Sequence, residues 1–157
     1  MRAPFLRQMN FLVENDDQDY IMFFGEDEEE NISLFRVDLD KTIHQGVGRL
    51  TRQINRLKNL AKIQIYGCWS ENMRLFLELF GVVVSNLSHQ PEIEFFLEEI
   101  ENLEIDERVL ENPIINQLSK LHYKSYDMNM FLKALMFNSR KLPHLKTLSL
   151  MIQQQYF

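Results

Sequence analysis

Apolar residues recur along this chain at a fixed spacing that predicts a series of short strands. Each of four copies has apolar residues at its first, fourth, seventh and ninth positions. The last two positions alternate as in a half-buried strand, and the wider spacing before them suits a turn of helix or a loop. The copies comprise Leu57, Leu60, Ile63 and Ile65; Leu97, Ile100, Leu103 and Ile105; Ile115, Leu118, Leu121 and Tyr123; and Leu142, Leu145, Leu148 and Leu150. They predict strands over residues 62–67, 101–106, 120–124 and 146–151, although coincidence in a leucine-rich chain is the alternative.

Helix signals lie between the predicted strands. A capping side chain or a proline stands where each helix would begin. The predicted helices begin at Glu71 after Ser70, at Pro91, and after Asp127, the last running to about Asn138, and residues 106–117 hold only a short helical turn that ends near Pro113. Strands that alternate with helices in this way imply a parallel sheet with the helices on one side.

The first forty residues follow a different pattern. Three short segments rich in β-forming residues, 9–15, 20–25 and 32–39, are separated by polar joints, which predicts an antiparallel meander. The joint at 26–30 is acidic and is expected to be a mobile loop. It lacks the alternating ligands and the glycine of a calcium-binding loop, so no metal site is predicted there.

An amphipathic helix is predicted directly after the meander. Asp40 is placed to cap it, and its apolar stripe is spaced by four, three, four and three residues. That stripe comprises Ile43, Val47, Leu50, Ile54 and Leu57. On another face Arg49, Arg52 and Arg56 line up at helical spacing. These arginines form either a docking stripe for an acidic partner or a phosphate backbone, or a solubilising face that pairs with the acidic loop.

Charge alternates in blocks along the 157 residues, which carry a net charge of -6. Residues 1–40 contain 3 basic and 11 acidic residues, and residues 41–70 contain 6 basic and no acidic ones. Residues 71–110 contain 2 and 10, and residues 111–157 contain 6 and 2. Nucleic-acid-binding domains usually show a basic excess or one dominant basic face, whereas these blocks can neutralise one another inside the fold.

No pattern in the chain identifies a catalytic or metal-binding site. Metal ligation needs clustered ligands, and the four histidines are scattered, with no two on one helix face. They are His44, His89, His122 and His144. Cys68 beside Trp69 follows a predicted strand, where a nucleophile could sit, but the sequence identifies neither the base nor the electropositive pocket that it would need. We therefore predict no enzyme activity, no metal and no cofactor.

Two phrases carry a resemblance to a known class of repeat protein. Leu57-Lys58-Asn59-Leu60 and Leu142-Pro143-His144-Leu145-Lys146-Thr147-Leu148-Ser149-Leu150 resemble leucine-rich-repeat proteins of the F-box-associated kind found in nematodes and plants. The order of a β meander, a helix and irregular repeats is also similar. The resemblance implies a platform that binds a substrate or partner protein. No F-box motif precedes the meander, and no functional residue is carried over.

The predicted fold class is α/β, with a short irregular leucine-rich-repeat-like parallel sheet, helices on one side, and the meander in front. The chain has the length of a single domain, 1–157, made of the meander (1–40) and the helix with repeats (41–157). No apolar run approaches the roughly 20 residues of a membrane helix, and no signal-peptide pattern is present. Because Cys68 is the only cysteine, a reducing location, cytoplasmic or nuclear, is expected.

We predict a non-catalytic protein–protein interaction module or scaffold. Its protein partner would use the concave strand face or the open C-terminal edge, where the chain either pairs with a partner or continues into a longer protein. The outward strand residues on the binding face are Gln64, Glu104, His122 and Ser149. The alternative is a nucleic-acid-binding module that uses the basic helix at 41–62. Its residues would be Arg49, Arg52, Arg56, Lys58 and Lys62. A small enzyme with a site assembled from distant residues is a third hypothesis.

Overall fold

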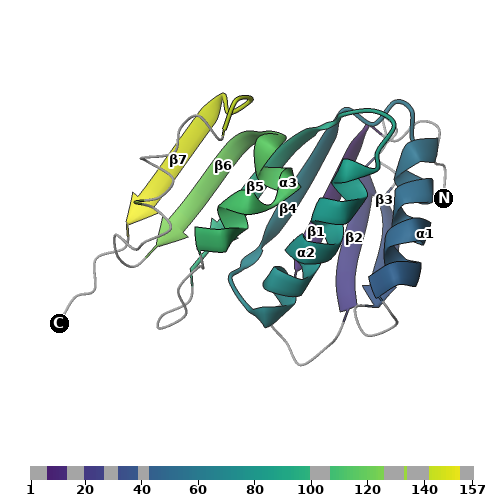
Figure 1. Cartoon of the computed structure of the whole chain (residues 1–157), viewed down its shortest axis with the longest axis horizontal. Coiled ribbons are helices and arrows are strands. Elements are labelled where there is room, and N and C mark those ends of the chain that lie inside the picture. Colours follow the sequence, from purple (N-terminus) through teal and green to yellow (C-terminus); the bar gives the residue numbers. More distant parts are fainter. Residues whose placement is uncertain are drawn as a thin grey trace.

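The computed structural model describes residues 7–13, 20–26, 32–38, 43–99, 107–125, 133 and 142–152. Seven strands form one sheet in the order β3-β2-β1-β4-β5-β6-β7 (Figure 1). The strands are β1 (Gln8–Val13), β2 (Tyr20–Glu26), β3 (Ile32–Asp38), β4 (Lys62–Cys68), β5 (Glu92–Glu98), β6 (Leu118–Ser125) and β7 (Thr147–Ile152). Together with the helices described next, this sheet confirms the α/β fold class.

The sheet has an antiparallel part and a parallel part. β2 lies antiparallel to both β1 and β3, within the residues for which the sequence predicts the meander. β1, β4, β5, β6 and β7 are parallel neighbours. The predicted strands over 62–67, 120–124 and 146–151 therefore correspond to β4, β6 and β7.

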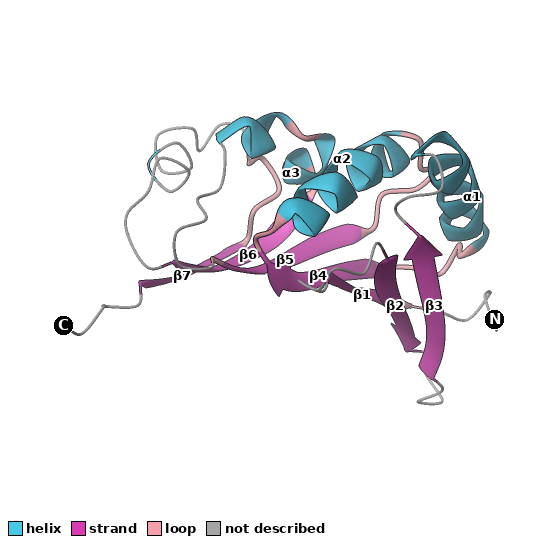
Figure 2. Ribbon diagram, turned by 90° about the horizontal axis from the view of Figure 1, so that it is seen from below, coloured by secondary structure: helices cyan, strands magenta, loops and turns pink. Residues whose placement is uncertain are grey.

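The helices cover one face of the sheet (Figure 2). They are α1 (Ile43–Arg56), α2 (Glu71–Ser85), the 3-10 turn η2 (Glu107–Glu111) and α3 (Pro113–Asn116). Ser70 begins α2 as predicted, because its hydroxyl oxygen accepts a hydrogen bond from the Met73 amide at 3.1 Å and satisfies a donor that the first turn leaves free. Asp40 and the helix predicted over 127–138, apart from Lys133, lie outside the described residues.

The core fills the space between the helices and the sheet. Along β1 the inward residues Met9, Phe11 and Val13 are buried and the residues between them are half-buried. The Phe11 ring lies 5.3 Å from Phe76 and 5.1 Å from Phe80, both on α2, measured between ring centroids. This aromatic cluster joins β1, next to the central strand β4, to the helix that covers it.

The structure corrects one predicted element and adds another. The helix predicted to begin at Pro91 is wrong, because residues 92–98 form β5. Inward apolar residues alternate along this strand with mostly acidic outward ones, and its backbone lies between β4 and β6. The short helical turn predicted to end near Pro113 corresponds to η2, which ends at Glu111. Pro113 then begins α3, whose N-cap, Asn112, accepts a hydrogen bond from the Ile114 amide at 3.0 Å. The predicted strand at 101–106 lies outside the described residues.

The repeat pattern corresponds to the strand register in its last two copies, and the second copy, apart from Leu97, lies outside the described residues. In the β6–β7 pair Leu121 lies opposite Leu148, and Tyr123 lies opposite Leu150, as the spacing requires. Ile65 lies opposite Phe95, which in turn lies opposite Leu121. The first copy is therefore displaced by two residues from the register that the repeat template implies.

Candidate functional site

Side chains on the face of the sheet away from the helices form rows, because parallel strands in register place equivalent residues side by side. One row crosses β4, β5, β6 and β7 and consists of Tyr66, Phe96, His122 and Ser149. We call it the central row. All four residues are half-buried, and no helix of the described part of the chain covers this face (Figure 2).

The central row is a nearly continuous aromatic surface. The Tyr66 and Phe96 rings stack with centroids 4.5 Å apart and planes 9° apart. The His122 ring lies 6.1 Å from Phe96, and its Nδ1 is 3.1 Å from the Ser149 hydroxyl oxygen. The Lys120 ammonium lies 5.2 Å from the centre of the Phe96 ring, a cation–π arrangement. These contacts hold the aromatic rings in fixed positions on an accessible face.

Hydrogen bonds fix the polar residues next to the central row. The Gln64 side-chain oxygen accepts hydrogen bonds from Gln8 at 2.9 Å and from the Tyr66 hydroxyl at 2.6 Å. Its amide nitrogen donates to Glu94 at 2.6 Å, and Glu94 also pairs with Lys62 at 3.1 Å. Burial acts to raise the pKa of the Glu94 carboxyl, but the hydrogen bonds from Gln64 and Lys62 outweigh it, so this pKa lies below its ordinary value.

Two further ion pairs flank the central row. The Lys124 ammonium lies 2.8 Å from a Glu98 carboxylate oxygen, and the Lys146 ammonium lies 2.5 Å from Glu92. Both pairs are partly accessible to solvent, so each contributes little stability. Their effect is electrostatic: the glutamates neutralise the positive charge of the two lysines on this face of the sheet.

The hydrogen bonds of Glu94 predict a pH-dependent contribution to stability. Because the folded-state pKa is lowered, this contribution is present above the ordinary glutamate pKa of about 4.3 and is lost as the pH falls through the folded value. We expect Glu94→Gln to be less stable than the wild type at pH 7, and the difference to shrink as the pH falls towards 3. Urea unfolding followed by the fluorescence of Trp69, the single tryptophan, measures both differences. An equal difference at the two pH values would contradict the prediction.

The predicted partner-binding residues fall on opposite sides of the molecule. Gln64, His122 and Ser149 lie on the face of the sheet away from the helices, which we call the open face. His122 and Ser149 are in contact in the central row, and Gln64 is hydrogen-bonded to Tyr66 of that row. Arg49, Arg52 and Arg56 are exposed on α1, in the helical layer. The structure therefore does not join the two sets into one surface, and Glu104 lies outside the described residues.

Sequence analysis missed three residues of this face: Tyr66, Phe96 and Glu94. The alternating pattern of β5 could have identified Phe96 and Glu94. Its inward positions carry Ile93, Phe95 and Leu97, and its outward positions carry glutamates and Phe96. A strand assignment over 92–98 would have placed Phe96 on the polar face, where an aromatic ring is unusual enough to mark a contact surface.

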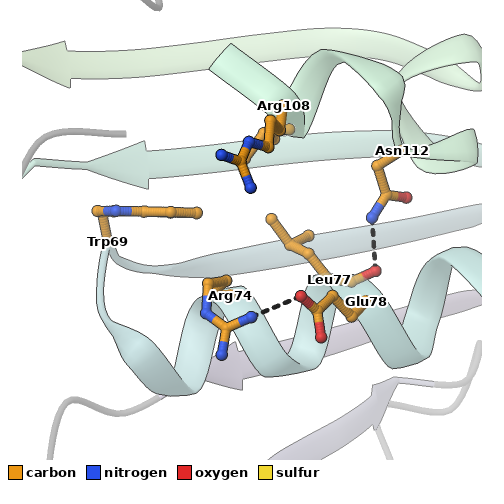
Figure 3. A pocket seen from close by; sticks show the side chains of 7 residues that line it. Trp69, Arg74, Leu77, Glu78, Arg108 and Asn112 are labelled. Atoms are coloured by element: carbon orange, nitrogen blue, oxygen red, sulfur yellow. Dashed lines mark hydrogen bonds and ion pairs between the residues drawn. The ribbon is translucent and has the colours of Figure 1, made fainter. Parts of the chain in front are cut away.

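A small cavity of about 220 Å³ lies on the other side of the sheet, between α2 and η2 (Figure 3). It is lined by Trp69, Arg74, Leu77, Glu78, Arg108, Val109 and Asn112. The Arg74 guanidinium pairs with Glu71 and with Glu78, the latter at 2.5 Å, so the charge of Arg74 is already balanced. Asn112 donates a hydrogen bond to the Leu77 carbonyl at 2.7 Å. This hydrogen bond joins the N-cap of α3 to α2.

Cys68 is not placed in surroundings that would activate it as a nucleophile. Burial raises the pKa of the Cys68 thiol, and the carboxylate of Glu98 on the adjacent strand raises it further. The reactive thiolate is therefore disfavoured, which is the reverse of what a catalytic cysteine needs. No group of three or more metal-ligating side chains occurs among the residues that the structure describes.

No family model, curated protein or solved structure matches this chain. Among the described segments, no helix has the length and apolar character needed to cross a membrane.

Proposed function

We propose that this chain is a non-catalytic protein-interaction module that binds a partner protein across the open face of the sheet. The observation that carries the proposal is the central row, a fixed aromatic surface bordered by hydrogen-bonded and ion-paired residues. Protein interfaces have this layout, with aromatic side chains enriched at the centre and polar or charged side chains at the rim. The single cysteine suits a reducing location, in the cytoplasm or the nucleus.

The charges on this face favour a protein over a nucleic acid. Lys62, Lys124 and Lys146 each lie beside a glutamate of β5. A phosphate backbone laid across the face would meet those carboxylates as well as the lysines, and it would gain little counterion release. A protein surface with mixed charges and an apolar centre avoids this repulsion.

Alanine substitution of Phe96 tests the proposal. A protein that co-purifies with the wild-type chain and is identified by mass spectrometry would be purified, and its affinity measured by calorimetry. We expect Phe96→Ala to weaken binding by about 2 kcal/mol, roughly 30-fold, because a stacked aromatic ring at the centre of an interface is a typical hot spot. Arg52→Glu, on the opposite side of the molecule, is the control and should change the affinity less than twofold.

Two results would reject this placement of the interface. One is unchanged affinity for a Phe96→Ala variant whose fluorescence and circular dichroism are those of the folded wild type. The other is loss of binding in the Arg52→Glu control, which would place the interface on α1.

A second candidate function is nucleic-acid binding through α1, because Arg49, Arg52 and Arg56 are all exposed on one helix. Lys62 does not extend this stripe, since it lies on β4 and pairs with Glu94. Binding of single-stranded RNA or DNA that falls steeply with salt and is lost in Arg52→Glu would support it. A flat gel-shift titration at low salt would remove it.

A further inference from the structure

The outer edge of β7 carries most of the exposed apolar side chains of the described chain. Four of the five exposed large apolar residues lie on β7: Leu148, Leu150, Met151 and Ile152. The fifth is Val82 on α2. The exposed fractions of the four β7 residues range from 39% for Leu150 to 51% for Met151. β7 is the last strand in the sheet order and pairs with β6 (Figure 1). No strand within the described residues pairs with its other edge.

β7 lacks two of the sequence features that commonly prevent strand addition, charge and proline. The sequence of β7, Thr-Leu-Ser-Leu-Met-Ile, contains no charged residue and no proline, and natural edge strands commonly carry one or the other. Lys146 directly precedes β7, but its ammonium is held by Glu92 on β5. An uncharged strand has no like charge to oppose a second strand of the same sequence.

We propose that β7 pairs with β7 of a second copy of this chain, in antiparallel orientation about a two-fold axis normal to the sheet. Such an axis keeps the helical face of one sheet on the same side as that of the other. Directly opposed residues must then point to the same face, so the register pairs even-numbered residues with even-numbered ones. The axis passes beside Leu150, which lies opposite Leu150 of the second copy, and Leu148 lies opposite Ile152.

The side chains of β7 favour this occupant over an unrelated strand. Leu148, Leu150 and Ile152 share the face of the buried β6 residues with which they pair, Leu121, Tyr123 and Ser125. In the symmetric register all the cross-strand pairs on that face are apolar, and no charged residue of β7 is brought near another. The strand is thus complementary to itself in backbone pattern, side-chain pattern and charge, as a symmetric interface requires.

The interface is small, which sets its expected affinity. One pair of six-residue strands buries less than the roughly 1,600 Å² of a standard protein interface, so we expect a dissociation constant on the order of micromolar. This inference does not rest on the proposed function, because the central row faces away from the helices and Leu150 lies on the helical side. The dimer would place the two open faces side by side on one continuous sheet.

Opposite charges at Leu150 test both the dimer and its register. Wild-type protein should show a monomer–dimer equilibrium in analytical ultracentrifugation over a concentration series. Leu150→Lys and Leu150→Glu should each raise the dissociation constant at least tenfold, because each variant places two like charges at the axis. An equimolar mixture of the two variants should recover a heterodimer, detected by a size tag on one of them.

Two further variants keep the test decisive. Val82→Lys changes an equally exposed apolar residue on α2 and should dimerise like the wild type. Ile152→Lys replaces Leu150→Lys if circular dichroism shows that the latter does not fold, and should also weaken the dimer. A wild type that stays monomeric at about 100 μM, a mixture that does not associate, or a Val82→Lys variant that is equally impaired would each overturn the proposal.

Discussion

Replacing Phe11 with alanine is expected to lower the free energy of unfolding by about 3–5 kcal/mol, the usual cost of removing a fully buried phenylalanine. Phe11 has an exposed fraction of 0% on β1, near the middle of the sheet. Its ring contacts Phe76 and Phe80, which are also fully buried and stack on each other with centroids 5.1 Å apart. The substitution removes the side chain that joins the sheet to α2, and two rigid rings cannot close the space.

Urea unfolding followed by the fluorescence of buried Trp69 measures the effect. A loss of this size is a large part of the 5–15 kcal/mol that stabilises a typical domain, so the unfolding midpoint should fall steeply. Phe11→Leu keeps most of the apolar volume and should cost about 1–1.5 kcal/mol. Val82→Ala, on the exposed side of α2, should change stability by less than about 0.5 kcal/mol. Equal effects for Phe11→Ala and Val82→Ala would contradict the description of the core.

The elements that the sequence predicted correctly are those whose local signals agree with their place in the fold. α1 has an apolar stripe on one side and exposed arginines on the other, and α2 begins at a serine that caps it. β4 and β6 alternate between buried and half-buried positions. In each case the periodicity of the side chains and the packing of the element require the same structure.

The errors arose where a local signal fits two structures. Pro91 followed by glutamates is typical of a helix start, but the same glutamates also suit the polar face of a strand. Hydrogen bonding with β4 and β6 decides between the two, and that partnership is not visible in a local window. The central row depends on the same decision, because Phe96 lies between Tyr66 and His122 only when β5 is a strand. The leucine-rich-repeat resemblance stays a prediction.

Replacing Gly67 with alanine is expected to destabilise the protein by about 2–3 kcal/mol, at the upper end of what an added methyl group costs in a packed core. Gly67 lies on β4 opposite Val13 of β1. A Cβ atom there would lie 2.6 Å from the Val13 carbonyl oxygen and 2.7 Å from the terminal carbon of Met73 on α2. The methionine can move, but the carbonyl belongs to the backbone of a neighbouring strand. The two central strands would therefore have to separate.

Gly48 provides the matched control, because the same substitution there should act in the opposite direction. It lies inside α1, and an added Cβ would meet no other atom within 4 Å. Alanine is favoured over glycine inside a helix by about 1 kcal/mol, so Gly48→Ala should stabilise the protein by about that amount. Both variants are compared with the wild type by urea unfolding under the same conditions. If Gly67→Ala were as stable as the wild type, β1 and β4 could not approach as closely at Gly67 as the structure shows, and the register that aligns the rows of the open face would have to be revised.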